Sequence, residues 1–265
     1  MRLCLTIAYV GTRYSGWQIQ EKPDAPPTIQ GLLEGVFAQV LQTPVRVHGA
    51  GRTDAGVHAD GQVAHVDVPD TRAGLDWVRI CNGRLPEDVR VMDARPAPPD
   101  FHARFSARGK IYTYQLWQNH RCMPPRLAPF VWDCGFRLDW DAVARAMPYL
   151  TGTHDFASFQ NTGTDIQSTE RTLHRLELRP DLVLMPHADA MAIQVEGDGF
   201  LKQMVRNMVG VLAAVGRGKI APEAMPELLA LRSRAALSRF VTAPARGLTM
   251  TRVLYEDGAP PAAGC

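Results

Sequence analysis

The sequence Gly51-Arg52-Thr53-Asp54-Ala55-Gly56-Val57-His58-Ala59 lies between two short runs, residues 45–48 and 62–68, that are typical of β-strands. It brings an arginine, a carboxylate and a histidine together within a few positions. Its two bracketing glycines let the backbone bend. A polar loop of this kind between two strands is a suitable place to hold a reactive side chain.

Outward from this loop, the N-terminal part of the chain alternates between strand and helix patterns. Apolar residues alternate along 2–9, which predicts a strand, and a polar, aromatic loop follows over 11–20. Thr28 is suited to cap a helix whose apolar side chains recur at helical spacing. The remaining elements are a helix over 75–84 and strands over 45–48, 62–68 and 89–92. The order β-α-β-β-α-β predicts a ferredoxin-like half over residues 1–105.

The second half, residues 106–265, repeats this mixture of strands and helices after a proline-rich boundary at Pro96, Pro98 and Pro99. Strands are expected over 105–117, 173–178, 191–195 and 248–255, and helices over 139–150, 200–215 and 224–231. We therefore predict the α+β class, with two ferredoxin-like α/β halves whose antiparallel sheets meet around a central cleft.

Length and composition are those of an ordinary globular protein. The chain has 265 residues, 46% of them hydrophobic and 21% charged, and no apolar run has the length of a membrane span. The N-terminus lacks the apolar core and cleavage site of a signal peptide, so we expect a cytoplasmic protein. Five widely spaced cysteines without Cys-x-x-Cys predict neither a disulfide framework nor a zinc site.

Positive charge is concentrated in two stretches, although the net charge is only +2. Residues 101–132 and 199–222 contain no acid. Their cations are Arg104, Arg108, Lys110, Arg121 and Arg126 in the first stretch, and Lys202, Arg206, Arg217 and Lys219 in the second. Each stretch by itself is typical of a solvated surface, whereas two of them near one site would favour a polyanionic partner.

Asp54 admits two interpretations. With Arg52 nearby, its charged form is favoured, and a charged carboxylate can act as a nucleophile or stabiliser at a sugar C1 centre. Alternatively, an aspartate shortly before a glycine often hydrogen-bonds its own backbone in a turn. The spacing alone leaves both interpretations open.

The sequence predicts neither a metal ion nor a cofactor. Several possible ligands lie close together, namely His48, Asp54, His58, Asp60, His65 and Asp67. Their spacing matches no established metal-ligand pattern, and His65 and Asp67 are as readily a hydrogen-bonded pair on one strand face. The phosphate-binding glycine loops and the Gly-x-Ser-x-Gly of hydrolases are also absent from the sequence.

Two distant residues complement Asp54. Tyr112 lies in the first acid-free stretch, where its ring is suited either to stack on a nucleobase or to pack in a half-buried strand. Arg206 lies among apolar residues of the helix over 200–215, and a buried arginine needs an acidic partner. No acid lies at helical spacing from it. Asp54 is therefore a reasonable partner.

The loop over residues 51–59 resembles the signature of the TruA family of tRNA pseudouridine synthases, and further segments match that family in order along nearly the whole chain. These segments are residues 16–20, 28–34, 101–107, 112–114, 156–159, 204–207 and 243–248. The resemblance implies the pseudouridine synthase fold. It also implies an isomerase that converts uridines 38, 39 and 40 of the tRNA anticodon stem-loop to pseudouridine, without metal or cofactor, as a homodimer.

The resemblance also implies the roles of the site residues. Asp54 becomes the catalytic carboxylate, which either adds to C1′ or takes the C2′ proton, and Arg206 becomes its ion-pair partner. Tyr112 stacks on the displaced base. Arg52, His58 and Gln18 contact the substrate. Two alternatives remain, a synthase of the same fold that acts on other uridines, and a non-catalytic RNA-binding module.

Overall fold

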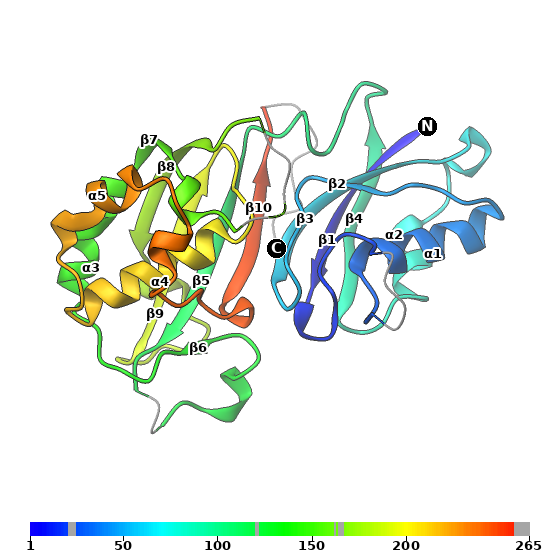
Figure 1. Cartoon of the computed structure of the whole chain (residues 1–265). Helices are drawn as coiled ribbons and strands as arrows, with labels where there is room; N and C mark the ends of the chain where they lie inside the picture. Colours follow the sequence, from blue (N-terminus) through cyan, green and yellow to red (C-terminus); the bar gives the residue numbers. More distant parts are fainter. Residues whose placement is uncertain (21–24, 120–121, 162, 164–166, 257–265) are drawn as a thin grey trace. The chain divides into compact units, whose positions relative to one another are not determined.

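The computed structural model describes residues 1–20, 25–119, 122–161, 163 and 167–256. The chain forms two compact units (Figure 1). The first unit is Met1–Lys110 together with the segment that begins at Thr249, and the second unit is Ile111–Leu248. No helix among the described residues is long and apolar enough to span a membrane.

The first unit has the predicted element order. Its elements are β1 (Arg2–Tyr9), α1 (Ile29–Leu41), β2 (His48–Gly49), β3 (His58–Asp67), α2 (Trp77–Asn82) and β4 (Val89–Ala97). The sheet order is β4-β1-β3, with β2 paired to β3, and all these pairings are antiparallel. This is the ferredoxin-like arrangement, in which each helix connects two strands that are not neighbours.

Both helices of the first unit pack on one side of its sheet. The Thr28 side chain caps α1 by accepting a hydrogen bond from Gly31 N at 3.2 Å. The ring of Phe37 on α1 stacks on that of Trp77 on α2, with centroids 4.8 Å apart. Strand β1 is buried on both faces, so it forms the centre of this core.

The last strand differs from the expected division. β10 (Leu248–Leu254) was predicted to belong to the second half, but it pairs in parallel with β3, where Thr249 lies opposite His58. Parallel pairing between residues almost two hundred positions apart leaves no local pattern in a sequence. Strand β3 also starts earlier than the predicted residue 62, since it already includes His58 and Ala59.

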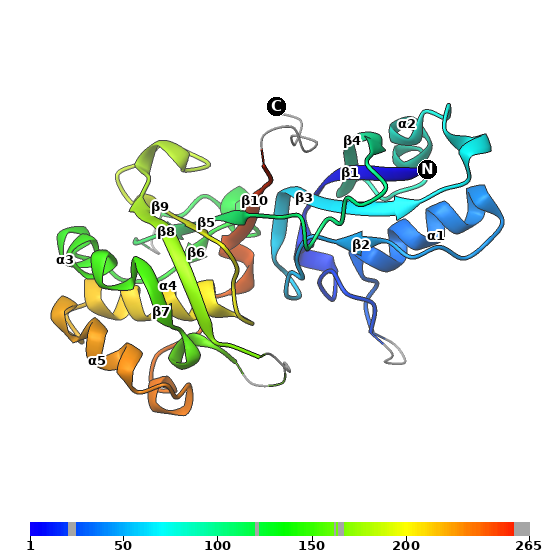
Figure 2. The same ribbon diagram turned by 90° about the horizontal axis from the view of Figure 1, so that it is seen from above.

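The second unit is also a mixture of strands and helices (Figures 1 and 2). Its strands are β5 (Gly109–Trp117), β6 (Trp132–Asp133), β7 (Gly152–Asp155), β8 (Glu170–Leu178) and β9 (Ala190–Gly197). Its helices are α3 (Trp140–Ala146), α4 (Met204–Gly216) and α5 (Met225–Ala230). The sheet order is β5-β9-β8-β7, with β6 on β5. The α+β class is thus confirmed, and this architecture fits the pseudouridine synthase fold.

Several element ends differ from the prediction for local reasons. The helix expected over 139–150 is α3 followed by a 3₁₀ turn, Met147–Leu150, which contains Pro148. Helix α4 begins at Met204 rather than residue 200, because Gln203 adopts a left-handed conformation with φ 59°. Strand β4 continues through Pro96, which an edge strand tolerates since it needs no ladder donor there.

Candidate functional site

Asp54 lies in a turn between β2 and β3. Its carbonyl oxygen accepts a hydrogen bond from Val57 N at 3.1 Å, and Gly56 has φ +80° inside this turn. This hydrogen bond joins two backbone groups, so it places Asp54 in a turn and leaves both interpretations of its side chain open. The side chain is half-buried, while that of Arg52 is exposed.

The loop that follows β1 holds this turn through its backbone. Trp17 N donates to Thr53 O at 3.1 Å, and Gly56 N donates to Tyr14 O at 3.4 Å. Gly16, with φ +86°, lies so close that an added Cβ would be 2.4 Å from Thr53 O. The loop over 11–20 is therefore a backbone support for the Asp54 turn.

Two buried polar side chains that no motif in the sequence marks as functional complete this support. Gln62 on β3 donates from Nε2 to Gly51 O at 2.7 Å, and Tyr9 on β1 shares a 2.8 Å hydrogen bond with Thr53 Oγ1. Burial raises the pKa of Tyr9 to about 12, so its hydroxyl keeps its proton. Gln62 is fully buried in β3, and no local pattern of the sequence shows which backbone oxygen its side chain meets.

The other predicted substrate contacts of the first unit have structural partners. His58 is buried, and its Nδ1 accepts a hydrogen bond from Gly11 N at 3.1 Å. Gln18 is half-buried and donates to Gln30 Oε1 at 2.7 Å. Gln30 in turn donates to Val47 O at 2.9 Å, which connects α1 to the segment before the Asp54 loop.

Tyr112 and Arg206 both lie in the second unit. Tyr112 on β5 is buried, and its ring meets that of Phe200 edge-on with centroids 5.1 Å apart. Arg206, in the first turn of α4, is half-buried rather than buried, and its Nε donates to Ala243 O at 2.8 Å. Its charge also acts on Tyr114, whose pKa burial raises well above its usual value while Arg206 opposes that rise.

Three histidines of the first unit approach one another closely. His48, His65 and His102 bring ring nitrogens within 4.8 Å of one another. However, His65 Nδ1 accepts from Ala103 N at 3.1 Å, and His102 Nδ1 accepts from Arg104 N at 3.1 Å. A neutral ring that accepts at Nδ1 carries its proton on Nε2, so it has no lone pair left for a metal ion.

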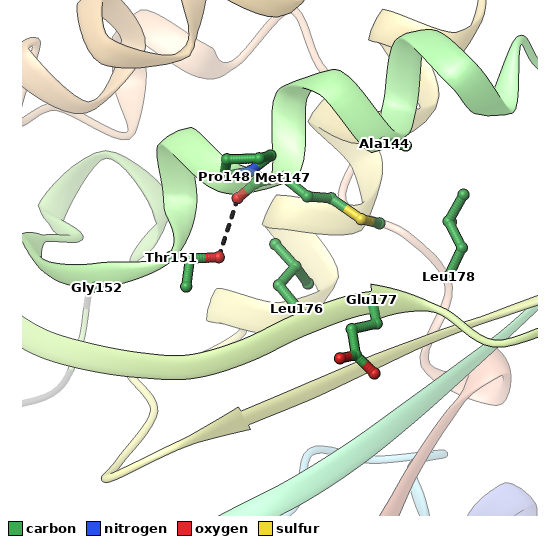
Figure 3. Close-up of a pocket in the computed structure, with 8 residues that line it drawn as sticks. All are labelled: Ala144, Met147, Pro148, Thr151, Gly152, Leu176, Glu177 and Leu178. Atoms are coloured by element: carbon green, nitrogen blue, oxygen red, sulfur yellow. Dashed lines mark hydrogen bonds between the residues drawn. The ribbon is translucent and has the colours of Figure 1, made fainter.

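A hollow of about 640 Å³ opens in the second unit between α3, the turn after it and β8 (Figure 3). Its lining residues are Ala144, Met147, Pro148, Thr151, Gly152, Leu176, Glu177 and Leu178. Thr151 Oγ1 donates to Met147 O at 3.2 Å across one end. Mostly apolar walls with one acid do not suit a phosphate, and none of the predicted site residues lines this hollow.

Comparison with known proteins gives one consistent result. A family model described as tRNA pseudouridine synthase matches residues 5–106 and 146–256. The tRNA pseudouridine synthase A of Nitratidesulfovibrio vulgaris (strain DSM 19637 / Miyazaki F) is 53% identical over 96% of this chain and 99% of its own length. The protein of that name from Lawsonia intracellularis is 49% identical over 96% and 99%. The one from Geobacillus kaustophilus is 40% identical over 97% and 95%.

Proposed function

This chain belongs to the family of tRNA pseudouridine synthases, which are isomerases acting on tRNA, and we propose that its targets are uridines 38, 39 and 40 of the anticodon stem-loop. The observation that carries this proposal is the Asp54 turn with its backbone support from the loop over 11–20. The segments resembling the TruA family extend along nearly the whole chain, which supports the same positions.

The proposed reaction breaks the N1–C1′ bond of uridine and forms a C5–C1′ bond. The proton on C5 leaves, and N1 gains one. Asp54 starts the reaction either by adding its carboxylate to C1′ or by removing the C2′ proton. Deuterium at C2′ separates the two routes, because it slows the reaction only where that bond breaks in the rate-limiting step.

The remaining site residues have supporting roles in this proposal. Arg206 is the ion-pair partner that the proposal assigns to the Asp54 carboxylate, and Tyr112 supplies the ring on which the displaced uracil rests. Arg52 is exposed and can reach a phosphate. His58 and Gln18 complete the set. Both lie in the first unit, where His58 Nδ1 accepts from Gly11 N and Gln18 Nε2 donates to Gln30 Oε1.

The proposal extends to a cytoplasmic homodimer that needs neither metal nor organic cofactor. The imidazole tautomers of His65 and His102 support the first part of that requirement. Light scattering during gel filtration measures the assembly. Activity that survives dialysis against a strong chelator is the expected result, and activity restored only by added metal would contradict the proposal.

Site-specific transcripts test the target positions. Three versions of one tRNA each carry a single uridine among positions 38, 39 and 40, with cytidine at the other two. We expect pseudouridine in each of them. Pseudouridine formed only elsewhere in the tRNA would contradict these positions while leaving the family assignment intact.

A further inference from the structure

A second hollow of the second unit has a different character. It measures about 340 Å³ and lies beside the C-terminal end of α4. Its walls include Trp132, Ala213 and Ile220, and its cations are Arg217, Lys219 and Arg239. Two of these cations, Arg217 and Lys219, belong to the acid-free stretch over 199–222 and have no part in the proposed chemistry.

The three cations lack acidic partners within the part of the chain that the structure describes. No ion pair and no side-chain hydrogen bond joins Arg217, Lys219 or Arg239 to another described residue. No acid lines the hollow. Asp133, which is adjacent in sequence to the lining residues Trp132 and Cys134, accepts a hydrogen bond from Gly135 N at 3.0 Å. The hollow is therefore a concentration of uncompensated positive charge.

Aromatic rings hold two of these cations in place. The guanidinium carbon of Arg217 lies 3.5 Å from the centre of the Phe136 ring, and that of Arg239 lies 4.9 Å from the centre of the Phe240 ring. A guanidinium that rests on a ring keeps its N–H groups available for other acceptors. It also presents its second flat face for stacking.

We propose that this hollow binds one nucleotide of the tRNA backbone. Lys219 and Arg239 bind the phosphate, and the base stacks on the outer face of the Arg217 guanidinium, which Phe136 supports from below. Arginine planes and lysine charges are the usual partners of unstacked bases and phosphates, and the volume suits a small ligand, for which pockets begin at about 300 Å³. The proposal rests on tRNA being the substrate, and it is independent of which uridine is modified.

The test compares two double variants of the full chain. Arg217→Ala with Arg239→Ala removes the stacking plane for the base and one of the two phosphate contacts, and it leaves Lys219 in place. Arg175→Ala with Arg179→Ala removes the same charge from arginines that are paired with acids, namely Glu177, Glu196 and Asp181. Equilibrium affinity for an unmodified tRNA transcript is measured at several salt concentrations, together with the single-turnover rate at saturating tRNA. Thermal unfolding verifies that each variant folds, and the glutamine versions of Arg217 and Arg239 replace any that does not.

We expect the first double variant to bind tRNA roughly tenfold or more weakly than the second, with a salt dependence shallower by about one ion per lost phosphate contact. Its rate at saturating tRNA should equal that of the control, because the hollow takes no part in the chemistry. Arg217→Lys should keep the salt dependence and lose affinity, since lysine has charge but no flat face.

Equal tRNA affinities of the two double variants would overturn the proposal. The hollow would then serve another anion if the first double variant alone lost affinity for uridine monophosphate or for a polyglutamate peptide. Because affinity for whole tRNA is measured, a wrong assignment of the modified uridines would leave this result unchanged, so the two failures are distinguishable.

Discussion

Gln62 and Tyr9 are positioning residues for the turn that carries Asp54. Their hydrogen bonds end on Gly51 and Thr53, and Thr53 directly precedes Asp54. Gln62 is completely buried, and its Oε1 has no hydrogen-bond partner among the described residues. A buried amide oxygen without a partner is energetically costly. The presence of glutamine here therefore indicates that the bond from its Nε2 to Gly51 O is needed.

Gln62→Met tests this role. Loss of the donor to Gly51 O should lower the free energy of unfolding by about 1–2 kcal/mol, since removal of the unpaired Oε1 offsets part of the cost. We expect kcat to fall at least roughly tenfold, because a small displacement of a reacting group is costly, while the tRNA Kd stays within about twofold. Steady-state kinetics and tRNA binding at a temperature where the variant is folded measure both. An unchanged kcat would make Gln62 a purely structural residue.

His65, one of the three clustered histidines, makes the stability of the protein depend on pH. Burial, helped by the neighbouring charges of His102, Arg2 and His48, lowers the pKa of His65 from 6.5 to about 4, with Asp67 acting in the opposite direction. The unfolded chain therefore binds this proton at a higher pH than the folded one. The contribution of the neutral His65 ring to the free energy of unfolding is complete above pH 6.5 and declines as the pH falls towards 4.

His65→Gln should flatten this pH dependence. Between pH 7 and pH 4.5 we expect the parent to lose roughly 2–3 kcal/mol more stability than the variant, since glutamine can accept from Ala103 N but does not titrate. Denaturant unfolding at both pH values measures the difference. Equal losses for the two proteins would mean that His65 titrates normally in the folded state.

At the scale of single residues, the sequence predicted the reactive side chain but not the side chains that hold its turn in place. Asp54 was identifiable because arginine, acid and glycine are close in one segment. Gln62 and Tyr9 were not, since alternation along a strand shows that a side chain points inward but does not show which backbone oxygen it meets. His58 and Gln18 were chosen from the motif, whereas their partners, Gly11 and Gln30, come from the folded chain.

Among the elements, the loop after β1 is the one that brings the Asp54 turn into position. It begins with the 3₁₀ turn Gly11–Arg13 and approaches the other loop at backbone distance. An added Cβ on Gly11 would lie 1.9 Å from Val57 O, a contact that only a shift of one backbone could relieve. Close approach, rather than an unusual φ, is the reason for glycine at this position.

Gly11→Ala should therefore separate the two loops. We expect a loss of stability of about 1–3 kcal/mol from overpacking and a fall in kcat. The matched control is Gly35→Ala in α1, where an added Cβ has no neighbour within 4 Å. That change should raise stability by about 0.5–1 kcal/mol and leave kcat unchanged. A Gly11→Ala protein as active as the control would show that the two loops do not need this contact.

The order of the elements was predictable from the sequence, and their ends were less so. The predicted Thr28 cap located the start of α1, which begins at Ile29. Pro96 was taken as a boundary, yet β4 runs through it and pairs there with Leu3 of β1, because an edge strand needs no N–H donor on its outer side. The start of α4 was misplaced, since a left-handed Gln203 has no signature in the local pattern.

At the scale of the whole molecule, the chain's two units are not two consecutive segments. The expected division at residue 105 lies close to the observed end at Lys110, but the segment from Thr249 returns to the first unit. There it pairs with β3 directly after the Asp54 turn, opposite His58 and Ala59. Strand β10 thus pairs with the strand that follows the predicted reactive loop.

The central claim is that Asp54 carries out uridine isomerisation in tRNA, and chemical mapping of pseudouridine tests it most directly. A tRNA transcript is incubated with the parent protein or with Asp54→Ala, and every uridine is then mapped. We predict pseudouridine in the anticodon stem-loop with the parent, and a rate lower by on the order of a thousandfold with Asp54→Ala, while tRNA affinity stays the same. Modification by Asp54→Ala at nearly the parent rate would contradict the account.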